Sequence, residues 1–499
     1  MARVALTLIL AFAFDIATAH AQQSSSLDTQ IAVLQSAARG ALARHGAEGA
    51  AVALVSGGAV VWSEGFGVAD ATTGAPVTAD TVFEAASVAK PVAAWAILRL
   101  ADEGRLDLDA PIQTYISGWA LPHSEFDRAK VTARRLLAHA AGISFGGDPG
   151  VEPGQDVPSL LDAADGEGME GGGIRVAYRP GEAYRYSSKG YLLLELAVEN
   201  ITGEPFAEYA KREILEPLGM SSSAFRWSPD LRARAATGHD WFGNPLPRYE
   251  HATSAPGGLV TTAGDLARFL AAAMPGPGGE APGRGVISPG SVGTSLTPYP
   301  FDNDTSLVGL GYNLDVSNGV RVARKSGDHR GFKPIVFSIP ELGAGLVILT
   351  NSDRAAAGVF ADTACPWSET LQGHPLRSIC GQLYTLRNAH WAIAACIWAI
   401  ALALSVGPVR GLAKGTRKVT AGISFRRGIA AGILLAILIA WWVFWYSDLA
   451  LRLLGYPKTF VTVRFDPWPT AFIWISIAVT SLLAIMLLRI FARRREDGK

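Results

Sequence analysis

The sequence predicts an α/β (α+β) protein with two lobes, one an antiparallel sheet flanked by helices and one mainly helical, followed by a C-terminal bundle of three transmembrane helices. With 499 residues the chain is too long for one ordinary domain. Strand patterns lie towards both ends of the first 355 residues, with helical patterns between them. Three long apolar stretches follow residue 388. We therefore expect a signal peptide (1–21), a globular domain (22–355), a linker (356–388) and a membrane region (389–499).

The first residues have the layout of a secretory signal peptide. Arg3 precedes an apolar run from Val4 to Phe14, and Ala19–His20–Ala21 resembles a cleavage site before a polar stretch. Asp15 is unusual at the end of such a run, and an uncleaved membrane anchor is the alternative.

The membrane region contains apolar stretches at about 389–406, 429–446 and 468–488. Each is near the roughly 20 residues that a helix needs to cross a bilayer. The loop 407–427 carries basic residues and no acidic residue, and the tail contains Arg493, Arg494 and Arg495. Because positively charged flanks stay in the cytoplasm, we expect a multi-pass protein of the cell (inner) membrane. Its C-terminus would be cytoplasmic and its globular domain periplasmic or extracellular, with the lipid bilayer as a partner.

The charges are unevenly distributed along the chain. The 44 basic and 44 acidic residues balance overall, but residues 389–499 hold 14 basic and 4 acidic residues. The globular part is thus mildly acidic and shows no basic patch for nucleic acid. Cys365 and Cys380 could form a disulfide, which the sequence leaves open. No His/Cys spacing indicates a metal and no glycine-rich loop indicates a phosphate cofactor, so we expect neither metal nor cofactor.

The expected elements of the globular domain alternate in type along the chain. A helix pattern at 26–46 precedes two strands at 49–70, which meet at the hairpin signal Ser56–Gly57–Gly58. Helical patterns follow from near Ser87, at 132–143, at 190–203 and at 261–274, and strand patterns return at 306–316, 320–327, 333–340 and 344–352. We therefore expect one sheet built from distant segments with a helical insertion, and an active site in the cleft between the lobes.

Ser87–Val88–Ala89–Lys90 is the first candidate for chemistry. Residues i and i+3 share a helix face, so the Ser87 hydroxyl and the Lys90 amine can meet. A serine becomes a nucleophile when a base removes its proton, and a buried lysine can be that base because burial lowers its pKa. Pro91 favours a helix that begins near Ser87, since proline is tolerated in the first turn. The alternative is a chance pair on an amphipathic helix.

Several longer segments carry a family resemblance. In chain order these are GFGVADATTGAPVTADTVFEAASVAK, LLAHAAGI, PGEAYRYSSKGY, EPLGMSSSAF, APGGLVTTAGDL and GLGYNL, together with VRVARKSGDHRGF. Over about residues 30–355 the chain resembles the serine β-lactamase and penicillin-binding-protein superfamily, in its class C β-lactamase and D-Ala-D-Ala carboxypeptidase/esterase branch. The resemblance implies a two-lobed serine β-lactamase-like fold for residues 22–355, and it does not reach the membrane region.

The same resemblance implies roles for three catalytic residues. Ser87 would be the acylated nucleophile and Lys90 its proton partner. Tyr186 stands where the family has the tyrosine of a Tyr-x-Asn motif, and it would shuttle a proton to the leaving group. The alternative for Tyr186 is a structural role as an aromatic residue of the core.

The resemblance also implies a substrate-binding strand. Lys325, Ser326 and Gly327 match the family's Lys-Thr-Gly element, in which the lysine and the hydroxyl hold a substrate carboxylate. The N–H of Asp328 would be the second oxyanion donor beside that of Ser87. A lysine at position 325, where many relatives have histidine, favours an anionic substrate, and a solvated strand lysine is the alternative.

Two positions depart from the family pattern. The asparagine of the Tyr-x-Asn motif is Ser188 here, a shorter residue without an amide donor, which puts in doubt the usual hold on Lys90 and on the substrate amide. Efficient β-lactam turnover is in doubt for the same reason. Asp328 adds a carboxylate for which the sequence gives no purpose. We interpret His139 and Glu182 as structural and His329 as a residue on the rim of the site.

The sequence thus predicts a membrane-anchored serine hydrolase that acts through an acyl-enzyme on a carboxylate-bearing amide or ester. The candidate substrates are D-alanyl peptides, β-lactams and small esters, with a small-molecule or peptidoglycan-derived substrate as partner. The alternatives are a cell-wall or β-lactam sensing module that signals through its transmembrane helices, and a scaffold with a degenerate site. The natural substrate and the oligomeric state do not follow from the sequence.

Overall fold

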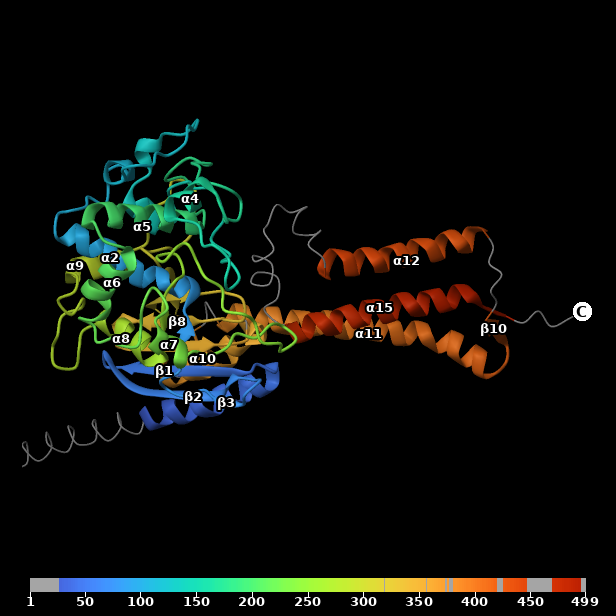
Figure 1. Cartoon of the computed structure of the whole chain (residues 1–499). Coiled ribbons are helices and arrows are strands. Elements are labelled where there is room, and N and C mark those ends of the chain that lie inside the picture. The colour runs from blue at the N-terminus through green and yellow to red at the C-terminus, as the bar shows by residue number, and fades with distance from the viewer. Residues whose placement is uncertain are drawn as a thin grey trace, which may run out of the picture. The chain divides into compact units, whose positions relative to one another are not determined.

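The computed structural model describes residues 27–317, 319–355, 357–372, 375–376, 380–419, 425–446 and 469–494. The chain divides into two compact units, Met1–Cys380 and Gly381–Lys499, and each is described by itself (Figure 1). The expected signal peptide, residues 1–21, lies outside the described residues.

A seven-stranded antiparallel sheet forms the centre of the first unit. Its spatial order is β3-β2-β1-β9-β8-β7-β6, so the hairpin near the start of the chain pairs directly with the last strand of the domain. The strands are β1 (Gly49–Ser56), β2 (Ala59–Asp70), β3 (Ala75–Pro76), β6 (Asn313–Ser317), β7 (Val320–Ser326), β8 (Ile335–Ile339) and β9 (Ala344–Thr350). The prediction of one sheet built from distant segments is confirmed.

Helices cover both faces of this sheet, which is why β1, β8 and β9 are buried over nearly all their length. Ala51, Ala53 and Val55 of β1 share a core with α8 (Ala263–Ala272). The helix of residues 27–45 and α10 (Ala357–Gln372) lie on the other side of the sheet from α8 (Figure 1). His45 contacts Asp362 of α10 at 2.9 Å, which ties these two helices together.

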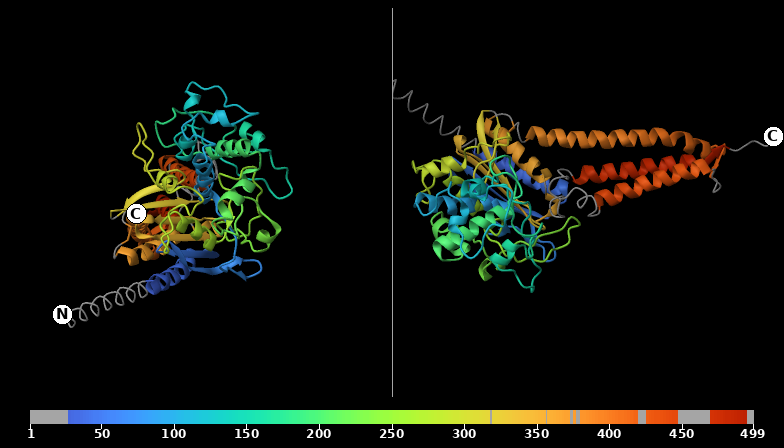
Figure 2. Two further views of the ribbon diagram at one scale, coloured as in Figure 1. Left: turned by 90° about the vertical axis from the view of Figure 1, so that its left-hand side faces the viewer. Right: turned by 90° about the horizontal axis from the view of Figure 1, so that it is seen from above.

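The second lobe is helical and is inserted between β2 and β6 (teal to green in Figure 2). Its centre is the pair α2 (Ala89–Asp102) and α5 (Ser188–Thr202). Trp95 of α2 is fully buried and its ring centroid lies 4.9 Å from that of Phe269 in α8, so the two lobes share one core. Contacts with α5 come from η2 (Ile112–Tyr115), α3 (Ala133–Leu137), α4 (Leu160–Asp165) and α6 (Phe206–Ala210), and contacts with α2 come from η4 (Lys211–Leu215) and α9 (Pro289–Ser295). The same part of the chain also contains η3 (Arg128–Lys130) and α7 (Pro229–Ala233), and Leu231 of α7 packs against Val82 and Val260.

Three elements differ from the sequence expectation. The helix expected at 132–143 ends at Leu137, because His139 and Gly142 take a left-handed backbone with φ of 55° and 68°. The strand expected at 306–316 begins only at Asn313. The expected linker 356–388 contains α10, which places Cys365 and Trp367 fully inside the first unit.

Cys365 and Cys380 form a disulfide across a sequence separation of 15 residues. The bond joins α10 to the end of the first unit. A closed loop of about this length restricts the unfolded chain and typically stabilises a fold by about 3 kcal/mol.

The second unit consists of helices α11 (Gln382–Ala413), α12 (Phe425–Tyr446) and α15 (Pro469–Phe491), of which α11 and α12 both contact α15. A short antiparallel ladder joins β10 (Arg417–Val419) to β11 (Ala492–Arg494). Within the described residues, Trp391–Ala413 is long and apolar enough to cross a membrane, whereas the apolar parts of the other two helices are shorter, at Gly428–Ala440 and Ile475–Leu487. Three transmembrane spans therefore stay a prediction.

Candidate active site

Ser87 lies where a short strand turns into the central helix of the helical lobe. β4 (Phe83–Glu84) pairs with β5 (Val260–Thr261), and the chain then enters the turn η1 (Ala86–Val88) and α2. Ala86 has a φ of 45°, a left-handed conformation that is uncommon for a residue with a side chain. Such conformations persist only where the surrounding structure enforces them, and they cluster at functional sites. The half-buried Ser87 follows this strained residue directly.

The Lys90 side chain is fully buried, and its amine makes three hydrogen bonds. Nζ lies 3.1 Å from Ser87 Oγ, 3.2 Å from Ser188 Oγ and 2.6 Å from the carbonyl oxygen of Pro256. No carboxylate pairs with Lys90 among the described residues, and burial lowers the pKa of its amine to about 7. A substantial fraction of Lys90 is therefore neutral near physiological pH and able to accept a proton.

Tyr186 lies between the two site lysines. Its hydroxyl is 2.7 Å from Ser87 Oγ, and the amines of Lys90 and Lys325 lie 5.1 Å and 4.9 Å from its ring centroid. Tyr186 is held by its neighbours, because the following residue, Ser187, donates its N–H to Nδ1 of His139 at 3.3 Å and its hydroxyl to the carbonyl of Ser144. The phenol therefore contacts the nucleophile in a positive field.

His139 supports the tyrosine and does not contact the nucleophile. Its ring centroid lies 4.4 Å from that of Tyr186, and burial holds the pKa of its imidazole well below the ordinary value. Because Nδ1 accepts the Ser187 N–H, the proton of the neutral ring sits on Nε2. This arrangement agrees with the structural interpretation made from the sequence.

The end of β7 lies against the nucleophile turn, and Gly327 allows this approach. A Cβ atom at position 327 would lie 2.7 Å from the carbonyl oxygen of Ala85 and 2.9 Å from Cβ of Ala86. Lys325, two residues earlier, is buried, and its amine makes no hydrogen bond within the described part of the chain. Burial lowers the pKa of Lys325 to about 8, with Lys90 contributing in the same direction. Ser326 between them is exposed.

The carboxylate of Asp328 has a partner that the sequence did not reveal. It pairs with the amine of Lys333, which also contacts Asp353 at 2.6 Å and the carbonyl of His329 at 3.2 Å. Burial disfavours the Lys333 ammonium, but the two carboxylates outweigh this and raise its pKa. The charge beside the expected oxyanion donor is therefore compensated by Lys333. Among the described residues, the N–H groups of Ser87 and Asp328 have no hydrogen-bond acceptor.

Sequence reasoning also missed two groups that position Lys90. Pro256 acts through a backbone carbonyl, which leaves no side-chain signal in the sequence. Glu195 lies on the buried face of α5 and accepts the N–H groups of Ser254 and Ala255 at 2.8–3.0 Å, so it holds the turn that presents the Pro256 carbonyl. Burial raises the pKa of Glu195 to about 8. A glutamate with this environment has the sequence pattern of an ordinary helix residue.

The structure thus brings the predicted catalytic residues and Ser188 into direct hydrogen-bond contact around Lys90 and Ser87. Ser188 is long enough to reach Lys90, so the contact that the sequence put in doubt is present. The Lys325 amine joins this group through its contact with the Tyr186 ring, 4.9 Å from the ring centroid. Ser326, Gly327 and Asp328 follow Lys325 in the chain at the end of β7. Their roles in binding a substrate stay predictions.

Comparison with known proteins agrees with this geometry. The model of the family described as Beta-lactamase matches residues 34–364. The chain belongs to the beta-lactamase family. The superfamily predicted from the motifs, that of serine β-lactamases and penicillin-binding proteins, is thereby confirmed.

Individual members of the family are distant relatives. Penicillin-binding protein 4 of Amycolatopsis lactamdurans is 31% identical over 312 residues, covering 59% of this chain and 78% of the relative. A human beta-lactamase-like protein is 28% identical over 333 residues, and the chain spans only 63% of its length. The octameric penicillin-binding protein homologue from Pyrococcus abyssi superposes with a TM-score of 0.59 at 25% identity, covering 72% of this chain and 80% of that one.

The contact between Gly327 and the nucleophile turn can be tested by substitution. Gly327→Ala should push the end of β7 away from Ala85–Ala86 and lower the rate of Ser87 acylation by an activated ester on the order of 10²-fold, the cost of a displacement of about 1 Å. Gly293→Ala is the matched control, because a Cβ at that helical position meets no atom within 4 Å. Equal acylation rates in both variants would show that the contact is dispensable.

Proposed function

We propose that the chain is a serine hydrolase that forms an acyl-enzyme on Ser87 with a carboxylate-bearing amide or ester. The observation that carries the proposal is that Ser87 Oγ lies within hydrogen-bond distance of both the Lys90 amine, at 3.1 Å, and the Tyr186 hydroxyl, at 2.7 Å. One nucleophile with two groups able to exchange its proton is the arrangement that covalent catalysis requires. Family membership supports the same conclusion.

Acylation would begin with the neutral Lys90 amine. It accepts the Ser87 proton as Oγ attacks the substrate carbonyl carbon, and the N–H groups of Ser87 and Asp328 stabilise the negative oxygen that forms. The C–N or C–O bond then breaks, and the leaving amine or alcohol takes a proton through the Tyr186 hydroxyl, which Lys90 replenishes. Water next attacks the ester, which releases the acid and restores the Ser87 hydroxyl.

Recognition of an anionic substrate would depend on Lys325. Its amine makes no hydrogen bond within the described residues and lies 4.9 Å from the Tyr186 ring centroid, close to the Lys90 amine at 5.1 Å from the same centroid. A substrate carboxylate would give this amine an ionic partner, with the exposed Ser326 hydroxyl beside it. D-alanyl peptides, β-lactams and small acidic esters all meet this requirement.

Anchorage in a membrane forms part of the proposal. The helix Trp391–Ala413 has the length and apolarity of a membrane span. In the described ladder, Arg417 and Lys418 pair with Arg494 and Arg493, so the basic loop after α11 and the basic end of α15 lie at the same end of the bundle. This is the arrangement expected when both face the cytoplasm. With three spans, the hydrolase unit would face the periplasm or the exterior.

The central experiment labels the full chain in detergent with a fluorescent penicillin and measures hydrolysis of a p-nitrophenyl ester. We expect labelling or ester turnover in the wild type, loss of both in Ser87→Ala, and no change in Ser221→Ala, which replaces an exposed serine outside the site. A label that is quickly released indicates a hydrolase that turns over β-lactams, and a label that persists indicates a sensor or a slow carboxypeptidase, which ester or D-alanyl peptide turnover then distinguishes. Absence of both activities in the wild type contradicts the proposal.

The pH dependence follows from the two lysines. Below about 7 Lys90 is protonated and cannot accept the serine proton, so kcat/KM for an anionic ester should rise with pH up to that value. Above about 8 Lys325 loses the charge that holds the carboxylate, so kcat/KM should fall again. Lys325→Arg, which keeps its charge, should move the alkaline limb to higher pH and leave the acid limb in place. A profile that is flat between pH 5 and 7 would rule out Lys90 as the base.

Ser188→Asn restores the family residue beside Lys90. We expect β-lactam turnover to increase, by about tenfold or more, because an amide can donate to the substrate as well as accept from Lys90. Release of the acyl group from Ser87, followed by mass spectrometry of the intact chain, measures this effect. Ser188→Thr is the control, since it keeps a hydroxyl, and turnover in Ser188→Asn at or below the wild-type level would refute the interpretation.

A further inference from the structure

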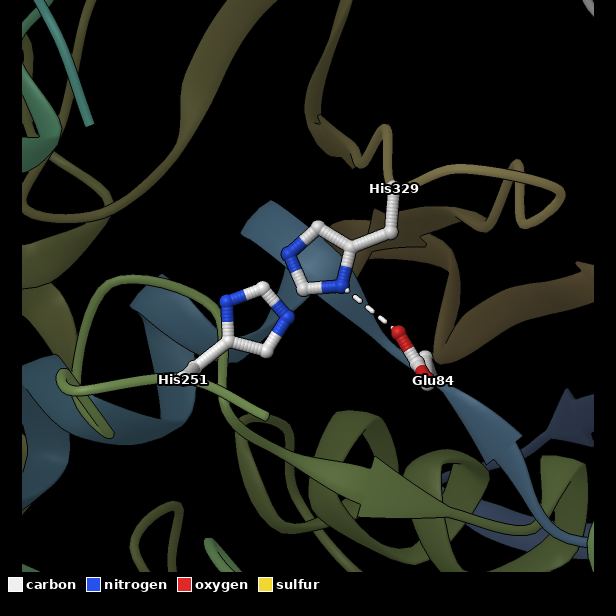
Figure 3. Close-up of side chains that lie close together, drawn as sticks. All are labelled: Glu84, His251 and His329. Atoms are coloured by element: carbon white, nitrogen blue, oxygen red, sulfur yellow. Dashed lines mark hydrogen bonds and ion pairs between the residues drawn. The ribbon is translucent and has the colours of Figure 1, made fainter. Parts of the chain in front are cut away.

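Three potential metal ligands meet beside the candidate active site but take no part in the proposed reaction. They are Glu84 at the end of β4, His251 in the segment before β5, and His329 in the turn between β7 and β8 (Figure 3). Nδ1 of His329 lies 2.9 Å from Oε2 of Glu84, and the two imidazole rings stack with centroids 4.8 Å apart. Segments far apart in sequence thus contribute two imidazoles and one carboxylate to one place.

The spacing of these groups is close to that of a metal site. One ligand atom from each residue lies within 4.8 Å of the others. In a tetrahedral zinc site with bonds of 2.0–2.1 Å, neighbouring ligand atoms are about 3.3 Å apart. To reach that separation from at most 4.8 Å, the stacked imidazole rings would have to tilt so that their nitrogen lone pairs converge on one point. The side chains of His329 and Glu84 keep 19% and 10% of their surface exposed, so an ion can reach them from solvent.

A fourth residue orients His251 in the manner of an outer carboxylate in a metal site. Nδ1 of His251 lies 3.6 Å from Oδ1 of Asp148, and the ring nitrogen farther from the backbone faces His329 and Glu84 (Figure 3). Asp148 is itself fixed by the N–H groups of Gly150 and Thr253, each at 2.9 Å. Histidine ligands commonly direct their second nitrogen to a carboxylate in this way, which fixes the tautomer that binds the metal.

We propose that Glu84, His251 and His329 form a binding site for one divalent transition-metal ion of the zinc type. The donor set of two imidazoles and one carboxylate suits zinc and its first-row neighbours and disfavours magnesium or calcium, which prefer oxygen ligands. This metal site has no recognisable pattern in the sequence, because the three residues are far apart in the chain and two of them lie in loops.

The ligands belong to the segments that frame the nucleophile. Glu84 precedes the strained Ala86 and Ser87, and His329 follows Asp328. Gly257 lies next to both segments, since a Cβ on it would lie 3.0 Å from His329 Nε2 and 3.6 Å from the carbonyl carbon of Ala86. A bound ion would therefore cross-link the Ser87 turn to the turn that carries the Asp328 N–H. Its role would be positional, because Ser87 has its own proton partners.

The test measures metal binding directly on the full chain in detergent after treatment with a chelator. Competition with a chromophoric chelator should show one equivalent of Zn²⁺, and Co²⁺ should give the visible absorption of a site with nitrogen and oxygen ligands. Glu84→Gln, His251→Asn and His329→Asn should each weaken Zn²⁺ binding at least tenfold. His123→Asn, which removes an exposed histidine outside the cluster, and Ser87→Ala should bind as the wild type does.

Two results would overturn the proposal. The first is that the wild-type chain binds no equivalent of Zn²⁺ under these conditions. This result would contradict the proposal whether or not the variants fold. The other is binding of equal strength in the wild type and in the three ligand variants, which would place the ion elsewhere. Thermal unfolding of each variant without metal shows whether it is folded. Because Ser87→Ala is expected to bind Zn²⁺ normally, failure of the hydrolase proposal and failure of the metal proposal are distinguishable.

Discussion

The burial of the Lys90 amine, without a carboxylate partner in the described part of the chain, is the constraint on which the site depends. An ammonium ion in this position loses its hydration, and among the described residues three oxygen atoms, those of Ser87, Ser188 and Pro256, replace it. The cost of burying the charge makes the neutral amine accessible near pH 7. A carboxylate beside Lys90 would stabilise the ammonium and remove the base. The acidic groups nearby are therefore engaged elsewhere, as Asp328 is by Lys333.

The fold supplies these oxygen atoms from widely separated parts of the chain. Ser87 comes from the turn before α2, Ser188 from the first residue of α5, and the Pro256 carbonyl from the segment before β5. Strand β7 approaches the same turn because the first hairpin pairs with the last strand and brings the C-terminal meander alongside it. Two buried ionisable side chains, Glu195 on α5 and Lys333 before β8, then hold the neighbouring loops in place.

Much of this arrangement could be predicted from the sequence. The first hairpin, the last strands and α8 follow from periodicity and turn residues, and Ser87, Lys90, Tyr186 and Lys325 follow from motifs that resemble a known family. Pro256 could not be predicted as a partner because a carbonyl has no residue signature. The pairing of Asp328 with Lys333 depends on tertiary structure and could not be predicted either. Helix α10 contains Pro366, and a proline inside a segment argues against a helix there. Each of the three predicted apolar stretches overlaps a described helix, but among the described residues only the first of these helices is long and apolar enough to cross a membrane, so three spans stay a prediction.

The absence of a side chain at Gly327 has a consequence for directed evolution of this protein. Neighbouring Ser326 is exposed and offers room for diversity, whereas position 188 needs a side chain that accepts a hydrogen bond from Lys90. Gly327 offers no room, because the carbonyl of Ala85 occupies the space that any larger residue would need. A mutant library aimed at new substrates would therefore randomise position 326, restrict position 188 to hydrogen-bond acceptors and keep the glycine codon constant.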